Sequence, residues 1–157
     1  MRFIVDCMHG KLARKMRIYG FDTLYGSNLD DDTILATAQK EERVVVTSDK
    51  NLIERAYSKR IPVVEAPLDS DVSRMTKIFR TYRLKPNLNP KHSRCPHCNS
   101  MLIKICKSQA KGVPERVLRR KRIFYKCENC GRIYWYGSHW AKIRNFEETL
   151  KKRLKDS

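Results

Sequence analysis

Two identical cysteine pairs constrain this chain more than any other feature of its sequence. Cys95 and Cys98 stand in RCPHCN, and Cys127 and Cys130 stand in KCENCG. A two-residue gap allows one tight turn to aim both sulfurs at the same metal ion, and two such turns complete a tetrahedral shell of four thiolates. A single pair would also suit a redox site, but two pairs together favour a metal.

We therefore predict a structural Zn²⁺ at these four cysteines, within a small zinc ribbon. Four thiolates leave no open position for water, so the ion would stabilise the fold without taking part in chemistry. Iron is an alternative occupant of the same shell. Asn99 and Gly131 follow the second cysteine of each pair, and both residue types tolerate the left-handed backbone that such a turn often needs. Cys7 and Cys106 are expected to be buried and have no assigned role.

The region before the cysteines alternates apolar strands with helices. Strands are expected at 2–6, 23–25, 43–47 and 61–65. Helices are expected at 11–19, from Asp31 onward, at 50–59 and at 70–82. This alternation predicts an α/β fold whose largely parallel sheet is flanked by helices on both faces. The predicted domains are 1–83 for this fold, a linker at 84–93, and 94–157 for the zinc ribbon with its C-terminal helix.

Three aspartates follow the predicted strands, where a parallel sheet binds ligands. Asp6 ends the first strand, Asp31 opens the helix after the second, and Asp49 follows the third. The carboxyl ends of parallel strands meet at one edge, so these side chains are expected to converge. Gathered carboxylates repel one another unless a cation joins them, and Mg²⁺ or Mn²⁺ prefers such oxygen ligands. We predict a catalytic Mg²⁺ or Mn²⁺ site at Asp6, Asp31 and Asp49.

Each of these acids has a structural alternative. Asp31 and Asp49 could each serve solely as a helix N-cap, because aspartate is favoured at that position. Asp30 and Asp32 are neighbours able to replace Asp31. Asp6 is harder to explain by packing, because an acid at the end of an apolar strand seldom helps a core.

The charge of the chain points to a polyanionic partner. There are 34 Lys and Arg against 17 Asp and Glu, which gives a formal net charge of +17. Basic residues placed against phosphates release condensed counterions, so this excess favours nucleic acid. A thermophilic protein also has a highly charged surface, but that surface usually balances its signs. We expect RNA contact through the densest basic run, which comprises Arg119, Arg120, Lys121 and Arg122.

Aromatic residues crowd the second cysteine pair. They could stack unpaired bases, or they could fill the core of a very small domain. For Tyr134 and Trp135 we favour the core. No run approaches the roughly 18 apolar residues that span a bilayer, and the apolar opening is too short for a secretory signal. We therefore expect a cytoplasmic protein without a membrane partner.

Several segments of the chain resemble a known family. The stretches FIVDCMHGKLARKMRIYGFDTLY, DDTILATA and RVVVTSD resemble the PIN-like RNase domain named for the C-terminal part of the Mut-seven exonuclease. RCPHCN and FYKCENCGRIYWYGSHW resemble the zinc ribbon that follows this domain in the same family. The resemblance implies a PIN-like fold and a metal-dependent ribonuclease. The family's acidic positions fall on Asp6, Asp31 and Asp49, and its basic helix, which could hold the RNA backbone, falls on Lys11, Arg14 and Arg17.

Two positions depart from the family's pattern. His9 stands where the family usually has a hydrophobic residue, and Ser48 stands where it usually has an arginine. All three acids are kept. We predict a metal-dependent endoribonuclease that acts on structured RNA, with the basic ribbon positioning the substrate. The alternative is a non-catalytic RNA-binding or ribosome-associated protein, with a ribosomal or ribonucleoprotein partner, that uses the nuclease fold as a scaffold.

Overall fold

The structure is a computed structural model that describes residues 1–156. Its first part alternates strands and helices in the order β1 (Arg2–Val5), α1 (Gly10–Ile18), β2 (Asp22–Tyr25), α2 (Asp31–Glu41), β3 (Val44–Thr47), α3 (Lys50–Ser58), β4 (Val63–Glu65) and α4 (Asp71–Thr81). A short 3-10 turn, Cys7–His9, joins β1 to α1. The predicted α/β architecture is confirmed, with small shifts in the bounds.

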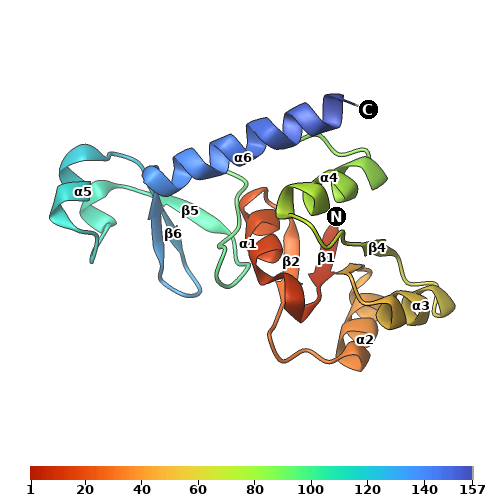
Figure 1. The fold of residues 1–157 in the computed structure, drawn as a ribbon. Helices are drawn as coiled ribbons and strands as arrows, with labels where there is room; N and C mark the ends of the chain where they lie inside the picture. Colours follow the sequence, from red (N-terminus) through yellow and green to blue (C-terminus); the bar gives the residue numbers. More distant parts are fainter. Residues whose placement is uncertain (157) are drawn as a thin grey trace.

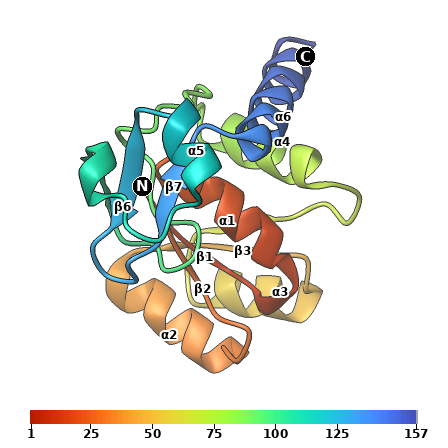
Figure 2. The same ribbon diagram turned by 90° about the vertical axis from the view of Figure 1, so that its left-hand side faces the viewer.

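The four strands form one parallel sheet in the order β2-β1-β3-β4. Because successive side chains of a strand point to opposite faces, each strand feeds two apolar layers. Phe3 and Val5 belong to the cluster that contains Met16 and Phe79, whereas Ile4 belongs to the cluster on the other face. Helices α2 and α3 lie on the opposite side of the sheet from α1 and α4 (Figure 2). A parallel sheet buried on both faces places all its carboxyl ends at one edge.

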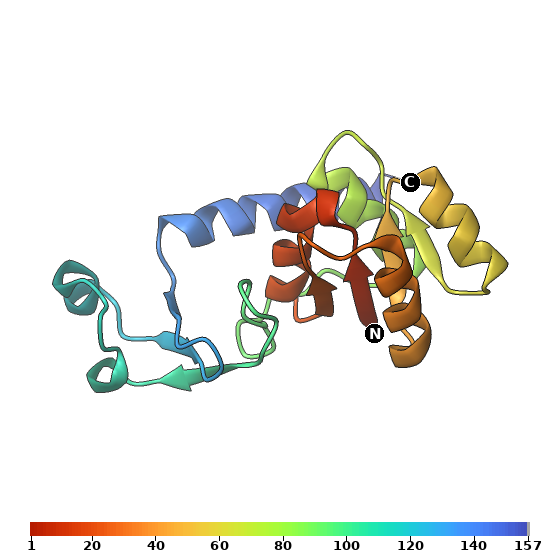
Figure 3. The same cartoon turned by 90° about the horizontal axis from the view of Figure 1, so that it is seen from below.

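The second sheet is antiparallel and much smaller. Its order is β5 (Leu102–Ile105), β6 (Phe124–Cys127) and β7 (Ile133–Trp135). The connection between β5 and β6 contains a 3-10 turn, Lys107–Gln109, and the short helix α5 (Glu115–Arg120). The small antiparallel sheet and its connections make up the ribbon. Figures 1 and 3 show α5 at the end of this ribbon that is farthest from the parallel sheet. The basic run that begins at Arg119 therefore lies far from the carboxyl ends of β1 and β3.

The last helix, α6 (Ser138–Lys155), leaves the ribbon and returns to the α/β layer (Figure 1). It packs on α4, and its Leu150 is fully buried in the same apolar cluster as Phe79. Packing thus joins the C-terminal helix to the parallel sheet, while the predicted division at 84–93 stays a prediction. Within residues 1–156, no helix has the length and apolar character needed to cross a membrane.

Candidate active site and metal centre

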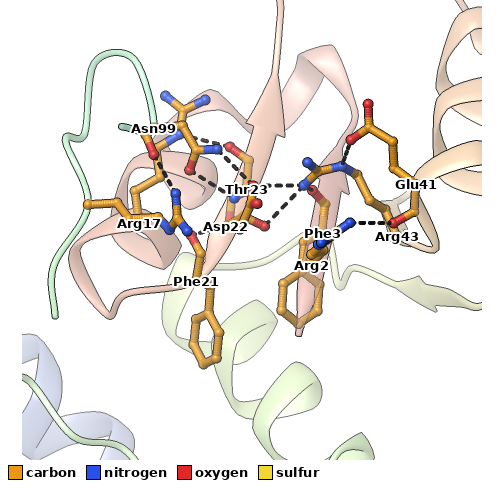
Figure 4. Close-up of polar contacts among 10 residues, drawn as sticks. Arg2, Phe3, Arg17, Phe21, Asp22, Thr23, Glu41, Arg43 and Asn99 are labelled. Atoms are coloured by element: carbon orange, nitrogen blue, oxygen red, sulfur yellow. Dashed lines mark hydrogen bonds and ion pairs between the residues drawn. The ribbon is translucent and has the colours of Figure 1, made fainter. Parts of the chain in front are cut away.

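The first cysteine turn is tied to the parallel sheet by a polar network on β2 (Figure 4). The side chain of Asn99 accepts a hydrogen bond from the Thr23 backbone N–H at 2.9 Å and donates to Asp22 Oδ1 at 2.9 Å. Arg43 Nη1 donates to the same carboxylate at 2.8 Å. Burial alone would raise the pKa of Asp22, but the hydrogen bonds from Arg43 and Asn99 hold it below its ordinary value. Asp22 is therefore a structural acid.

Arg17 requires a correction, because it was expected to hold the RNA backbone. Arg17 is only 5% exposed to solvent. Its guanidinium donates to three backbone carbonyls, those of Thr23, Pro96 and His97. The side chain is thus occupied in holding the first cysteine turn against α1. Lys11 and Arg14 on the same helix are exposed, and their contact with RNA stays a prediction.

The four cysteines of the two pairs converge. Their sulfurs all lie within 4.8 Å of one another. Cys95 and Cys130 are 3.6 Å apart, and Cys98 and Cys127 are 3.3 Å apart. Four sulfurs bound tetrahedrally at about 2.3 Å from zinc would be separated by about 3.8 Å. The arrangement fits a metal ion bound by four thiolates and is consistent with a zinc ribbon.

The turns that carry these cysteines have the expected backbone. Asn99 has a φ of 70° and Gly131 has a φ of 75°. Both values lie in the left-handed region, which glycine adopts freely and asparagine tolerates. Cys7 and Cys106 are exposed, so the expectation that they are buried is wrong.

Tyr134 is a residue of this centre that sequence reasoning assigned only to the core. Its Oη lies 3.1 Å from Cys95 Sγ, where the hydroxyl can donate to the sulfur. Burial, followed by the neighbouring Cys95 sulfur, raises the pKa of Tyr134 well above its ordinary value. Hydrogen bonds to a ligand atom orient that ligand and tune a bound metal. The only signal in the sequence is the position of this tyrosine, four residues after Cys130.

The acidic edge begins with two aspartates that follow neighbouring strands. Asp6 follows β1 and is 6% exposed, and Asp49 follows β3. The Thr47 hydroxyl donates to Asp6 Oδ2 at 2.9 Å and accepts from the Asp49 backbone N–H at 3.0 Å. Thr47 therefore fixes both acids. Its signal in the sequence is the polar side chain that closes the apolar run VVVT.

Asp49 also serves as a helix N-cap, which is its structural alternative to metal binding. Its Oδ1 accepts hydrogen bonds from the backbone N–H groups of Asn51 and Leu52, at 2.8 and 3.1 Å, and so caps α3. This cap engages one carboxylate oxygen and fixes the direction of the other. A capping role and a metal-binding role are therefore compatible at this residue.

Asp31 does not cap α2, contrary to the expectation that it fits this position. The N-cap is Asp30, whose Oδ1 accepts from the Thr33 backbone N–H at 2.7 Å. Asp31 is instead the first residue of the helix, and its carboxylate lies 3.4 Å from Arg55 Nη1 on α3. Asp32 pairs with the same arginine. Arg55, which the sequence did not single out, thus brings a cation to the acidic edge.

The three acids act on one another electrostatically. Burial raises the pKa of Asp31, the negative charges of Asp49 and Asp6 raise it further, and Arg55 opposes them. Among residues 1–156, only the cysteines bring their ligand atoms together within 4.8 Å, so the three carboxylates are more widely spaced. Mg²⁺ keeps several of its waters and is often held by only one or two carboxylates, so acids spaced in this way could hold only a hydrated ion.

Comparison with known proteins assigns the family. The model of the Mut7-C RNAse domain matches residues 1–147. The chain belongs to the Mut7-C RNAse domain family. The match includes the three acids and all four clustered cysteines, and the family indicates a ribonuclease-type function. No curated protein and no solved structure matches the chain.

His9 and Ser48 contact each other beside the acidic edge. His9 Nε2 lies 2.8 Å from Ser48 Oγ, and Ser48 Oγ donates to the Ala66 carbonyl at 2.7 Å. Because the serine has one proton, the Nε2–H of the imidazole is the donor to Ser48. Burial, followed by the charge of Arg74, lowers the pKa of His9. A neutral imidazole thus links the ends of β1, β3 and β4 beside Asp6.

Proposed function

We propose that this protein is a metal-dependent endoribonuclease that cuts structured RNA at the edge formed by Asp6, Asp31 and Asp49. One observation carries the proposal: burial, and then the negative charges of Asp49 and Asp6 on two other elements, raise the pKa of Asp31. Mutual repulsion of carboxylates is unfavourable unless a cation compensates it, and perturbed acids of this kind gather at functional sites. Membership of a family of RNase domains supports the same activity.

The acids would hold Mg²⁺ or Mn²⁺, and such an ion activates water and stabilises the leaving oxygen of a phosphodiester. The protein itself supplies the orientation. Thr47 holds the Asp6 carboxylate, the N-cap of α3 holds that of Asp49, and Arg55 lies beside that of Asp31. Fixed carboxylates lose little freedom when a substrate binds, which favours reaction.

The zinc ribbon would position the substrate. We propose Zn²⁺ at Cys95, Cys98, Cys127 and Cys130 as a structural ion, because their sulfurs fit a closed shell. Arg119, Arg120 and Arg122 are exposed on and after α5, where they serve no packing purpose. RNA is the proposed partner, free or within a ribosomal or other ribonucleoprotein particle. Charge reversal across 119–122 should flatten the salt dependence of RNA binding, and an unchanged slope would remove this run from the interface.

The central test is cleavage of labelled structured RNAs with Mg²⁺ or Mn²⁺. The informative variant is Asp6→Asn combined with Asp49→Asn. Asparagine accepts the hydrogen bond from Thr47 and is a good N-cap, so the variant is expected to fold. Glu54→Gln is the matched control, because Glu54 is an exposed acid of α3 outside the three proposed ligands. Wild type and control should cut only with the added ion, while the double variant should bind RNA without cutting it.

The second candidate function is RNA binding without catalysis. It is favoured by the structural roles of two acids, since Asp49 caps α3 and Asp31 contacts Arg55. In that case wild type and double variant would bind a broad panel of RNAs equally and neither would cut. That result would replace the nuclease with a scaffold for a ribonucleoprotein.

A further inference from the structure

A groove separate from the acidic edge runs between the two sheets. Its volume is about 750 Å³, and its walls come from α1, the first cysteine turn, the strands of the ribbon and the start of α6. None of Asp6, Asp31 and Asp49 lines it. Sites of roughly 300–1,000 Å³ hold ligands of small-molecule size, so a groove of this volume encloses only a short part of a polymer.

The charge of the groove has one sign. Basic side chains reach it from three sides, with Arg14 on α1, Arg132 before β7 and Lys142 on α6. All three are exposed. No aspartate or glutamate lines the groove among the residues that the structure describes. Such a surface attracts an anion and repels none of its charges, so charge complementarity selects a phosphate-bearing occupant.

The same walls carry a connected row of aromatic rings. Tyr136 and Trp140 meet edge to face with centroids 4.7 Å apart, and Tyr125 meets Tyr136 at 6.2 Å. Tyr136 and Trp140 remain half-buried instead of fully enclosed. Trp135 differs, because it packs on the small apolar cluster of the ribbon. Proteins that bind single-stranded nucleic acid combine a basic groove with aromatic rings on which unpaired bases stack.

Two polar atoms of the groove's residues lack a protein partner. Tyr19 Oη and Arg94 Nε are buried and make no hydrogen bond with any residue of the described chain. Both side chains contribute to the lining. Buried polar groups are nearly always paired, so these two unpaired donors are an unusual feature of the residues around the groove.

Helix α1 connects the groove to the acidic edge. Lys11, Arg14 and Ile18 are spaced by three and four residues, lie on one face of α1 and line the groove. The helix begins at Gly10, only four residues after Asp6. A nucleic acid strand that runs along this face toward the start of α1 therefore approaches the acidic edge.

We propose that this groove binds a short unpaired segment of RNA, with bases stacked on Tyr136 and Trp140 and phosphates held by Arg14, Arg132 and Lys142. An adjoining part of the same RNA is then led along α1 to the acidic edge. The choice of RNA over DNA rests on the proposed ribonuclease function. The groove itself selects an unpaired, phosphate-bearing strand.

The test measures binding of a short fluorescent oligouridylate to the full chain by anisotropy. The chain carries Asp6→Asn and Asp49→Asn, and Mg²⁺ and Mn²⁺ are left out, so cleavage does not interfere. Adding Trp140→Leu should weaken binding roughly five- to hundred-fold, as expected for the loss of one stacked base. Lys142→Glu should weaken it and lower its salt dependence. Lys152→Glu, an exposed site on the same helix outside the groove, should do neither.

Several results would overturn the inference. A duplex of equal length could bind as tightly as the oligouridylate, or Lys142→Glu could behave like Lys152→Glu. The groove variants could instead alter sedimentation of the free protein, which would make the groove an interface between copies of this chain. Since Lys142 is exposed, its variant keeps the test informative even if Trp140→Leu fails to fold.

The outcomes separate this inference from the proposed function. If wild type cuts RNA but the groove variants hold oligouridylate normally, the groove inference fails alone. If the groove holds oligouridylate and no RNA is cut under any metal condition, the nuclease proposal fails alone.

Discussion

The parallel sheet and the ribbon sheet are held together by different means. The parallel sheet lies between two layers of fully buried side chains, with Phe3 and Phe79 in one and Ile4 and Leu52 in the other. The ribbon's buried cluster contains only Ile105, Ala110, Val113 and Phe124. The ribbon compensates with four convergent sulfurs. A domain with so small an apolar core needs a metal or another covalent support.

This difference also separates the two kinds of polar site. At the acidic edge, the Thr47 hydroxyl fixes the Asp6 carboxylate and the first backbone N–H groups of α3 fix that of Asp49, without any ion. At the thiol cluster, two turns from distant parts of the chain must meet, and a bound ion would hold them together. The acidic edge should therefore keep its geometry without an ion, whereas the ribbon should not fold without the proposed zinc.

The largest effect is expected when the thiol cluster is broken. Cys95→Ser removes one ligand and should release zinc and unfold the ribbon, because a structural zinc contributes on the order of 10 kcal/mol to a small domain. Metal analysis and circular dichroism would measure this. Cys106→Ser is the control, since this exposed cysteine lies outside the cluster. Retained zinc and unchanged melting in Cys95→Ser would contradict the four-thiolate site.

The next largest effect concerns the packing of α6. Leu150→Ala should lower the free energy of unfolding by about 2–5 kcal/mol, because it empties a fully buried position beside α4. Zinc content should not change, because Leu150 packs in the core of the parallel sheet and not in the ribbon. Thr149→Ala, at an exposed neighbour, should stay within about 0.5 kcal/mol in urea unfolding. A loss of zinc from Leu150→Ala would show that the two regions are not independent.

A smaller effect is expected at the contact between the two regions. Arg17→Met keeps the apolar stem but leaves three carbonyls without their donor, and should lower stability by about 1–3 kcal/mol. The salt dependence of RNA binding should not change. Arg14→Met, exposed on the same helix, should show the reverse pattern. Weaker RNA binding at unchanged stability in Arg17→Met would restore the original assignment of Arg17.

The smallest effect concerns His9 and pH. Burial and Arg74 lower its pKa below the ordinary value of 6.5, although Asp6 and Asp71 oppose this. As the pH falls below 6.5, the unfolded chain takes up a proton before the folded chain does. The neutral imidazole therefore contributes its full stabilisation of the folded state above pH 6.5. This stabilisation decreases as the pH falls toward the lowered pKa.

His9→Gln should remove this pH dependence, because the amide can still donate to Ser48 without titrating. Urea unfolding above and below pH 6.5 measures the difference. His92→Gln is the control at an exposed histidine and should keep the wild-type dependence. An identical pH dependence in His9→Gln would assign the effect to other groups.

Much of the fold followed from local patterns. Apolar strands alternating with helices implied the parallel sheet, and the two-residue gaps implied the convergence of the four sulfurs. The left-handed backbone at Asn99 and Gly131 also followed from residue type. The predicted site at Asp6, Asp31 and Asp49 and its role in catalysis stay predictions.

The sequence by itself thus determined the features that depend on spacing along the chain, because neighbours in sequence share one backbone geometry. Only the tertiary structure decided which side chains are used up by partners from elsewhere. It buried Arg17 against the first cysteine turn, joined His9 to Ser48 and returned Leu150 to the core of the parallel sheet. Each of these contacts joins residues at least 39 positions apart, and their packing depends on the whole fold and not on any local pattern.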